Sequence, residues 1–574
     1  LPRFDFDTTA TPYLGVESNN LTLPSNWVRA GSTQGMSALG TTLRPQEIEQ
    51  KRRTLGAGGM LRLWRELDFN VDYRRTNLDG TRIQPGAFLT AATELAQPID
   101  FTTDEIDIGI GYRGSSWNAE LSYFGSFFKN DDAGYAWDNA FTTGNVDVGA
   151  QSQPPDNDFH QVALSGAWRG PARTTLTGRI ATGQMEQNEG FLPYTVNPNL
   201  TASPLPRANL DGKVDTLNVH LRATSTPWRR LRVNAEYRHD DRDNKTGVAA
   251  YDYVVTDIAP GQTVMNLPYG YQRQTFGLDG DLRLANWLRV ALGWDRNEME
   301  RNLQERDETE SDRVWTKLRM STGGLFDASL LLATEERKGS AYETLTMARS
   351  PQNPLMRKYN MADRDRDEVE FRFGSNPTDR LNIGFTTRYA EDDYDSSPIG
   401  VLRTEDFTWT IDGSFAFPNG SSLYGAFTRE EIESDQSNSQ NFGAPDWAAG
   451  AKDRFNTLVT GLQLPAMIDK LNVNLDYVIA RSTGSNAIEF TNSTQGGPYP
   501  GLHNNLHSLR IFVDYEWKES TTFRFGFWRE RFDSSDWALD GVQPATVSNL
   551  LSMGADAHKY DVNAFLFSVT YRPQ

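Results

Sequence analysis

The sequence predicts an all-β protein, a large antiparallel up-and-down transmembrane β-barrel. Residues 231–238 read Leu-Arg-Val-Asn-Ala-Glu-Tyr-Arg, with apolar and polar residues in strict alternation. This period of two returns about twenty times along the chain, as expected for half-buried strands. The apolar fraction of 38% is low for 574 residues and lies on alternate positions, so several compact soluble cores are a poorer interpretation.

The two faces of each strand can be assigned from the alternation, because successive side chains point to opposite sides of a sheet. In residues 66–73, Leu, Phe, Val and Tyr alternate with Glu, Asp and Asn, and residues 368–373 and 509–517 repeat the pattern. We expect the apolar face to meet lipid and the charged face to line the lumen.

Aromatic residues fall near the strand ends, which suits a belt at the lipid headgroups; the alternative is ordinary exposed aromatics of a soluble sheet. The residues concerned are Tyr73, Tyr112, Tyr123, Tyr237, Trp294, Tyr389, Tyr477 and Trp517.

Nine pairs of predicted strands are joined by short turns. These turns lie at residues 114–115, 169–172, 227–228, 285–286, 322–324, 374–377, 418–420, 465–466 and 518–520. Longer polar segments alternate with them, at residues 130–157, 183–212, 239–271, 338–364, 433–453, 481–503 and 533–559. Tight turns in the periplasm and long loops outside the cell are typical of outer-membrane barrels.

Unpaired strands around residues 67–73 and 565–571 bring the expected total to about twenty, an even number. Residues 1–59 are predicted to form an N-terminal segment, either a long loop or a plug, and residues 60–574 the barrel.

Composition excludes several classes of function. No apolar run is long enough for a membrane-spanning helix. The chain has no cysteine, so it cannot form disulfides or attach a c-type haem through Cys-x-x-Cys-His. Its net charge of −19 argues against nucleic-acid binding and makes cationic partners possible. No signal peptide is found at Leu1, so we expect the numbering to begin inside a mature or truncated chain.

No motif nominates an active site, and we predict no catalytic, cofactor-binding or metal-binding residues and no enzyme activity. His503 and His507 would share one face of a helix, or would lie about 13 Å apart on one face of a strand; since no helix pattern surrounds them, we do not expect the pair to bind a metal. Alternating acids at residues 241–244 and 363–367 lack the glycine and the final glutamate of a calcium loop. We interpret both segments as mixed-charge strand ends or as parts of the lumen lining. Calcium binding is the alternative interpretation.

Several strings, in order along the chain, resemble the MtrB/PioB-type barrels of outer-membrane porin-cytochrome complexes. They are residues 11–13 (Thr-Pro-Tyr) with 21–24 (Leu-Thr-Leu-Pro), 98–104 (Pro-Ile-Asp-Phe-Thr-Thr-Asp), 137–141 (Trp-Asp-Asn-Ala-Phe), 185–195 (Met-Glu-Gln-Asn-Glu-Gly-Phe-Leu-Pro-Tyr-Thr), 237–246 (Tyr-Arg-His-Asp-Asp-Arg-Asp-Asn-Lys-Thr) and 362–367 (Ala-Asp-Arg-Asp-Arg-Asp). The strings at 185–195 and 237–246 are the most specific.

The resemblance implies an integral protein of the bacterial outer membrane that sheathes and insulates a periplasmic multihaem c-type cytochrome, through which electrons cross the membrane. Haem c would be carried by that partner and none would be bound covalently by this chain. An extracellular multihaem cytochrome docking on the outer loops is also implied.

Two departures from the family accompany the resemblance. The family tends toward about twenty-six strands, so strands before Leu1 and an N-terminal Cys-x-x-Cys would be missing here. The chain also ends Tyr571-Arg572-Pro573-Gln574, where a final aromatic residue is common. The alternative function is a solute-transporting porin with an open or loop-plugged lumen, since a polar lumen serves both functions.

Overall fold

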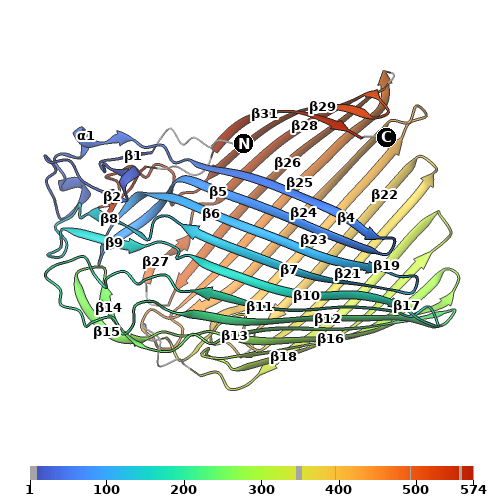
Figure 1. Cartoon of the computed structure of the whole chain (residues 1–574), viewed down its shortest axis with the longest axis horizontal. Helices are drawn as coiled ribbons and strands as arrows, with labels where there is room; N and C mark the ends of the chain where they lie inside the picture. Colours follow the sequence, from blue (N-terminus) through green and yellow to red (C-terminus); the bar gives the residue numbers. More distant parts are fainter. Residues whose placement is uncertain are drawn as a thin grey trace.

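Long, tilted strands dominate the computed structural model, which describes residues 9–343, 352–394, 396–468, 470–491, 493–554 and 559–572. Figure 1 shows them wrapping around a barrel, with most of the connecting chain at one end. Twenty-four strands follow one another in the order of a closed barrel. The predicted all-β, up-and-down transmembrane architecture is confirmed. None of the helices described is long and apolar enough to cross a membrane.

Twenty-one of these strands are long and make up the wall. They are β4 (Gln50–Trp64), β5 (Leu67–Phe88), β6 (Ala91–Arg113), β7 (Trp117–Asn130), β10 (Asn157–Arg169), β11 (Thr175–Gln187), β12 (Gly212–Trp228), β13 (Leu231–Asn244), β16 (Tyr271–Ala285), β17 (Leu288–Arg301), β18 (Glu308–Ser321), β19 (Phe326–Gly339), β21 (Arg364–Thr378), β22 (Leu381–Asp393), β23 (Ile399–Ala416), β24 (Ser422–Asn438), β25 (Trp447–Ile468), β26 (Leu471–Phe490), β28 (Leu502–Lys518), β29 (Thr521–Ser535) and β31 (Lys559–Tyr571). Three short strands belong to the same sheet: β20 (Met356–Arg357), β27 (Ser493–Pro498) and β30 (Leu550–Leu551).

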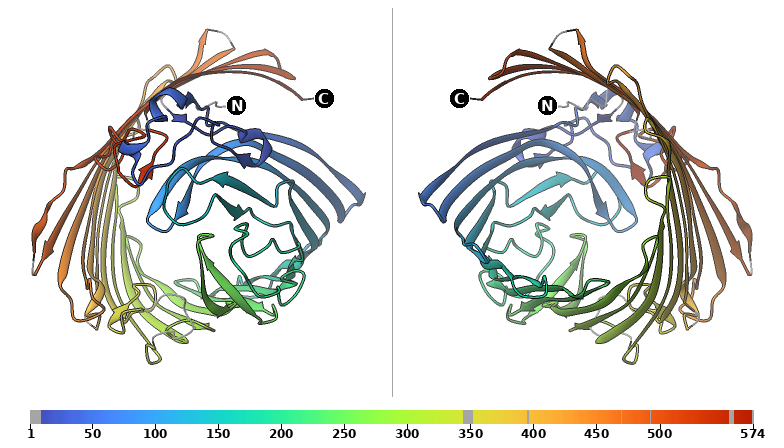
Figure 2. Two further views of the ribbon diagram at one scale, coloured as in Figure 1. Left: turned by 90° about the vertical axis from the view of Figure 1, so that its left-hand side faces the viewer. Right: turned by 90° about the vertical axis from the view of Figure 1, so that its right-hand side faces the viewer.

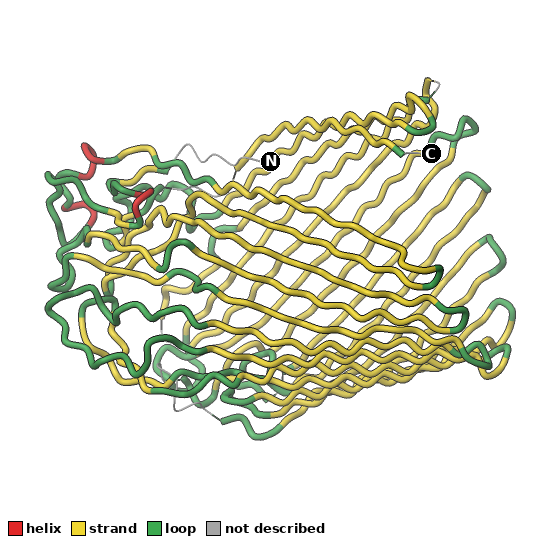
Figure 3. Tube along the Cα trace, in the orientation of Figure 1, coloured by secondary structure: helices red, strands yellow, loops and turns green. Residues whose placement is uncertain are grey.

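The remaining elements lie outside the wall. They are β1 (Ala10–Thr11), η1 (Val16–Ser18), β2 (Asn20–Leu21), η2 (Thr33–Gly35), α1 (Leu39–Thr42), β3 (Arg44–Pro45), β8 (Gly134–Asp138), β9 (Val148–Ser152), β14 (Ala250–Val255) and β15 (Ala259–Met265). Figure 3 shows helix at one end of the barrel alone, the end that also carries the longer loops.

All nine predicted hairpin pairs are present, but three turns lie slightly later than expected. The strands run on through Pro227, Pro377 and Pro465, and in each pair the register shifts around the proline. Proline cannot donate a ladder hydrogen bond, so it is accommodated at such irregularities. In these three hairpins the proline therefore marks a bulge just before the turn and not the turn itself.

A tenth hairpin was missed. The strand around residues 67–73, expected to be unpaired, pairs on one side with β4 and on the other with β6. β4 carries three glycines, and its apolar positions at Leu55, Ala57, Leu61 and Leu63 are interrupted by Gly58, Gly59 and Met60, so the alternation was too irregular to predict a strand. The predicted domain boundary after residue 59 falls within this strand, and the division itself stays a prediction.

Two segments expected to be long loops are mostly strand. β24 and β25 leave only residues 439–446 between them, and β26 runs to Phe490. Their polar alternation continues the strand period beyond the apolar band. These strands therefore stand well above the membrane, where both faces meet water.

The two ends of the strand order meet at β4 and β31. Each neighbouring pair of long strands with a register is antiparallel, so with twenty-one strands the first and last run in the same direction. No register joins β31 to β4 in the ranges described above, and Figure 2 shows the C-terminal strand standing apart from β4. Short β30, in the connection between β29 and β31, pairs in parallel with Ala92 and Thr93 of β6. It therefore connects the last strands of the sheet with the first ones.

The main hydrophobic core lies at the long-loop end and not within the wall. We call this unit the cap; it combines residues 9–49, the β8–β9 hairpin, the adjoining ends of β5 and β6, and residues 545–553. Its buried apolar side chains are Tyr13, Leu21, Met36, Leu39, Phe88, Ala91, Leu95, Tyr135, Trp137, Ala140, Phe141, Val146 and Leu551. In Figure 2 the cap and the β14–β15 hairpin lie within the outline of the barrel at that end.

Candidate functional site

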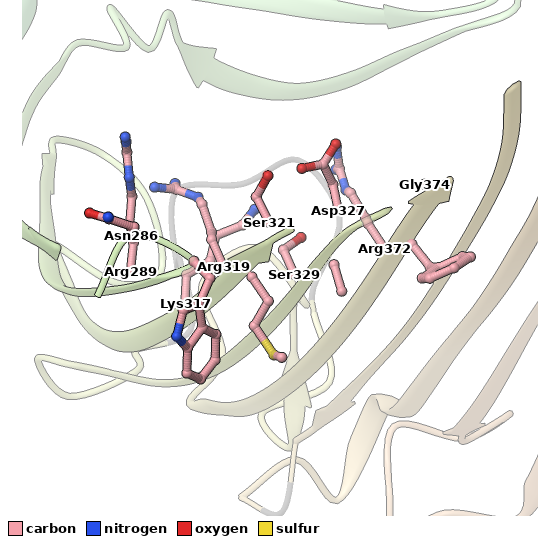
Figure 4. Close-up of a pocket in the computed structure, with 13 residues that line it drawn as sticks. Asn286, Arg289, Lys317, Arg319, Ser321, Asp327, Ser329, Arg372 and Gly374 are labelled. Carbon is pink, nitrogen blue, oxygen red and sulfur yellow. The ribbon is translucent and has the colours of Figure 1, made fainter. Parts of the chain in front are cut away.

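The lumen wall is the candidate functional site, and alternation along each strand decides which side chains reach it. On β17, Leu292 is 62% exposed on the apolar face, whereas Arg289 lies on the other face. Figure 4 shows Arg289, Arg319, Asp327 and Arg372 projecting from the same side of the sheet. On β21 the exposed Val369 belongs to the lipid face, as predicted from the sequence.

One ladder of ion pairs crosses the lumen wall from β17 to β23. Arg313 contacts Asp295 at 3.4 Å and Glu368 at 3.0 Å. Glu368 also accepts a hydrogen bond from Arg388 at 2.9 Å, and Arg388 reaches Asp406 at 2.8 Å. Each charge therefore has at least one opposite charge beside it, which a partly desolvated wall requires.

A second ladder runs nearer the long-loop end and uses the family string at residues 362–367. Arg364 contacts Glu335, and both Arg364 and Arg366 contact Asp392. Because side chains alternate, the arginines of this string face the lumen and the intervening aspartates face outward. The string is therefore part of the lumen lining, one of the two roles expected for it.

A basic hollow of about 550 Å³ lies on the lumen side near the tight turns. Its polar lining comprises Asn286, Arg289, Lys317, Arg319, Ser321, Asp327, Ser329 and Arg372. The strand register puts Arg289 opposite Arg319, and Ser329 opposite both Arg319 and Arg372. We call Arg289, Arg319 and Arg372 the mouth arginines. They form one row close to the end of the barrel that carries the tight turns.

The mouth arginines differ in how they are paired. Arg319 donates to Asp281 at 2.5 Å, and Arg372 donates twice to Glu370. Arg289 has no ion pair among the residues described. Arg372 and Arg319 remain about half exposed, so their guanidinium groups keep donors free for a ligand or a protein surface.

The residues considered above as possible metal ligands lie apart from one another or are paired with other groups. His507 lies on the lipid side of β28, where its Nδ1 is 2.9 Å from the Tyr477 hydroxyl, and nothing joins it to His503. In the 241–244 string, Asp243 lies 3.6 Å from Lys245, a charge pair at the end of β13. No group of three or more His, Asp or Glu gathers in the parts of the chain that can be described.

The family strings near the N-terminus build the cap, a role that the sequence analysis did not assign. The Tyr13 hydroxyl donates to the carbonyl oxygen of Asp138 at 2.8 Å, and the Asp138 carboxylate accepts from the backbone N–H of Leu23 at 2.7 Å. Trp137 packs on Phe88 with ring centroids 5.7 Å apart. Burial raises the pKa of Tyr135 to about 12, so that hydroxyl stays protonated.

The string at residues 185–195 is held to the cap by Asp257. One oxygen of this carboxylate accepts from the Thr195 hydroxyl at 2.5 Å and from the backbone N–H of Val196 at 3.1 Å. Its other oxygen accepts from the backbone N–H of Ala150 on β9 at 3.1 Å. The buried Asp257 thus joins three segments at the long-loop end. This structural role explains the string at residues 185–195 without any catalytic function.

A buried ion pair fixes two further loops at this end. The Glu305 side chain is almost completely buried and contacts Lys358. Arg306 beside it donates to the carbonyl oxygen of Met361 at 2.6 Å and pairs with Asp363 at 2.8 Å. Although burial opposes ionisation, the hydrogen bonds, led by that from Lys358, hold the pKa of Glu305 below its ordinary value of 4.5.

Acidification is therefore expected to release these loops. A lowered carboxyl pKa stabilises the folded loop fully above 4.5, and the contribution is lost as the pH falls through the lower folded value. Hydrogen exchange of residues 352–363, corrected for intrinsic rates, should show constant protection above pH 4.5 and a progressive loss as the pH falls below it. Glu305→Gln should cost about 1.5–3 kcal/mol of local stability at neutral pH and remove the acid transition; an unchanged acid transition would assign it to another group.

Comparison with solved structures gives the same fold. The outer membrane transporter YddB from Escherichia coli superposes with a TM-score of 0.51 at 9% identity, covering 94% of this chain and 77% of that chain. The FrpB iron transporter from Neisseria meningitidis (F5-1 variant) gives 0.52 at 9% identity, covering 90% and 80%. At such low identity the likeness concerns the barrel architecture alone.

Comparison of sequences identifies the family. The outer membrane protein MtrB of Shewanella baltica (strain OS185) is 30% identical to this chain over an alignment of 580 residues. The alignment covers 100% of this chain and 81% of that protein. The profile described as putative outer membrane beta-barrel porin, MtrB/PioB, matches residues 1–572. Together with the barrel fold and the two-faced wall, these matches show that the chain is an integral outer-membrane protein and belongs to the MtrB/PioB family of β-barrel porins.

Proposed function

We propose that this barrel sheathes a periplasmic multihaem c-type cytochrome and insulates it from lipid while electrons cross the outer membrane. The observation that carries the proposal is the ion-paired lumen wall in a barrel of this family. Barrels of about twenty-two strands already have a lumen too wide for side chains to fill, so a protein occupant is physically reasonable. The chain has no cysteine to attach haem c, so the partner must bring its own haem.

The lumen wall offers such a partner a fixed set of donors and acceptors. Charges that are already paired in the ladders do not have to be neutralised by the partner, so a polar protein surface can dock with little loss of hydration energy. The opposite face of the same strands is apolar and holds lipid away from the occupant. No residue of the wall is assigned a catalytic role.

The mouth arginines give the partner an entrance. They lie near the tight turns, which outer-membrane barrels place in the periplasm, the side from which the cytochrome arrives. Guanidinium groups bind carboxylates in bidentate geometry, so we expect the entering surface to carry acidic groups. The cap and long loops at the other end are the proposed contact surface for an extracellular multihaem cytochrome.

Purification from native membranes in mild detergent tests the proposal. A haem absorbance spectrum that comigrates with the barrel, together with a second polypeptide rich in Cys-x-x-Cys-His, is expected. A haem-free barrel that makes liposomes permeable to small sugars would overturn the proposal and favour the alternative, a solute-transporting porin. The similarity to transporter barrels is the observation that keeps this alternative open.

Charge reversal at the mouth separates a lumen partner from one bound elsewhere. Arg289→Glu combined with Arg319→Glu should lower the haem-to-barrel ratio at least tenfold, which corresponds to about 1.4 kcal/mol. Lys245→Glu combined with Lys338→Glu makes the same charge change at exposed positions on the outer surface and should leave the ratio unchanged. Equal losses in both variants would exclude the mouth arginines as the entrance.

A further inference from the structure

A second hollow, of about 700 Å³, lies on the lipid side of the wall across β26, β28 and β29. Its lining comprises Tyr477, Arg481, Asn505, His507, Leu509, Arg529, Arg531 and Asp533. It is separate from the lumen site, because these side chains lie on the opposite face of the sheet from Arg510 and Arg524, the inward residues of the same strands.

The strand register arranges the hollow in rows of increasing polarity. Ile511 pairs with Phe527 in a fully apolar row, and Leu509 pairs with Arg529 in the next. His507 pairs with Arg531 one row further toward the long loops. The apolar row continues across β31 into Phe565, which is 82% exposed, as a lipid-facing residue should be.

The hollow lies at the level of the outer-leaflet headgroups. The outward residues of β28 are apolar or aromatic from Trp517 near the tight turn to Leu509, eight residues away. At about 3.3 Å per residue, the ten residues from Trp517 to His507 are about 33 Å along a strand tilted by about 35–45°, a rise of about 23–27 Å, which matches the apolar band of about 25 Å in outer-membrane barrels. His507, the next outward residue after Leu509, therefore lies at the edge of the hydrocarbon on the side of the long loops.

The cations of the hollow are available to a ligand. Arg481 has no ion pair within the described ranges. Arg529 contacts Asp561 at 2.9 Å and Arg531 contacts Asp533 at 3.2 Å, with both guanidinium groups more than half exposed. Exposed pairs of this kind are weak, so an incoming anion can share these arginines. Such a basic cluster is unusual in a chain whose net charge is −19.

We propose that this hollow binds a phosphate group of an outer-leaflet glycolipid. Arg481, Arg529 and Arg531 would hold the phosphate oxygens, since guanidinium groups match phosphate geometry. Leu509, Ile511 and the neighbouring phenylalanines provide the apolar shelf on which the acyl chains lie. The lipid source is favoured over free phosphate because cationic rows directly adjoin this lipid-facing shelf. The proposal depends on the outer-membrane location and not on a cytochrome in the lumen.

Native mass spectrometry of the detergent-purified protein, incubated with diphosphorylated lipid A, tests the proposal. The wild-type chain should retain the lipid at least tenfold better than a dephosphorylated analogue with the same acyl chains. Arg481→Gln combined with Arg529→Gln and Arg531→Gln should abolish this preference. The control, Arg510→Gln combined with Arg524→Gln, changes two inward arginines of β28 and β29 and should preserve the preference.

Three results would overturn the proposal. Equal retention of the two lipids by the wild-type chain would show that phosphate is not recognised, and this measurement does not depend on any variant folding. Loss of preference in the inward control would place the site elsewhere. Full competition by inorganic phosphate at a concentration equal to that of the lipid would show that the acyl shelf contributes nothing.

Discussion

Val233→Arg is expected to lower the free energy of barrel folding, because an arginine that faces lipid costs about 2–4 kcal/mol at the bilayer midplane and less toward the membrane surfaces. Val233 lies between Leu231 and Tyr237 on the outward face of β13, within the apolar band. Phe371→Arg on β21 should behave in the same way, because it lies between Val369 and Phe373 on the outward face. Equilibrium urea unfolding in liposomes measures the loss.

The adjacent lumen residue provides the control. Asn234 is hydrogen-bonded at 2.7 Å to Asp279, so an arginine introduced there meets a carboxylate in a polar lumen. Asn234→Arg should therefore change the unfolding free energy by less than about 1 kcal/mol. If Val233→Arg and Asn234→Arg were tolerated equally, the assignment of the lipid and lumen faces would be wrong.

Phe88→Ala is expected to destabilise the cap by about 3–5 kcal/mol, the usual range for removing a buried phenylalanine. The ring is 1% exposed and packs on Trp137, and a Cβ added at Gly149 would come within 2.7 Å of it, so the ring is tightly enclosed and its removal leaves a cavity. Hydrogen exchange at β8 and β9 should rise sharply while that of the barrel strands stays constant.

An exposed phenylalanine gives the comparison. Phe442 lies in the short loop between β24 and β25 and is 56% exposed, so Phe442→Ala should leave exchange in the cap unchanged. Uniform loss of protection throughout the barrel in Phe88→Ala would mean that the cap and the wall unfold as one unit, contrary to the separate core described here.

Sequence alternation was sufficient to predict the wall and its two faces. The outward Val369 and Phe373 and the inward Arg372 follow from the period of two alone, because a one-residue slip would put every apolar side chain in the lumen. β4 could not be predicted in this way, because its glycines interrupt the alternation of apolar and polar residues. The prolines misplaced three turns because a bulge and a turn share the same residue preferences.

The details of the site required the strand register. Arg313 and Glu368 belong to β18 and β21, which are separated by β19, so no spacing in the sequence announces their contact. The cap was missed for a similar reason, because Phe88 is the last residue of β5 and Phe141 lies in the loop between β8 and β9, and they join one core only when that loop folds over the end of the barrel. The family strings include Phe141 but not Phe88, and they did not reveal that the two pack in one core.

The cap also joins segments that lie far apart in the sequence. The Thr33 hydroxyl donates to the carbonyl oxygen of Val547 at 2.9 Å, and the backbone N–H of Ala92 donates to Asn549 at the same distance. Contacts spanning this much of the chain carry a large loop-closure entropy and form after local hairpins. Completion of the extracellular mouth must therefore wait until the final hairpins have been inserted, which makes it a natural checkpoint in biogenesis.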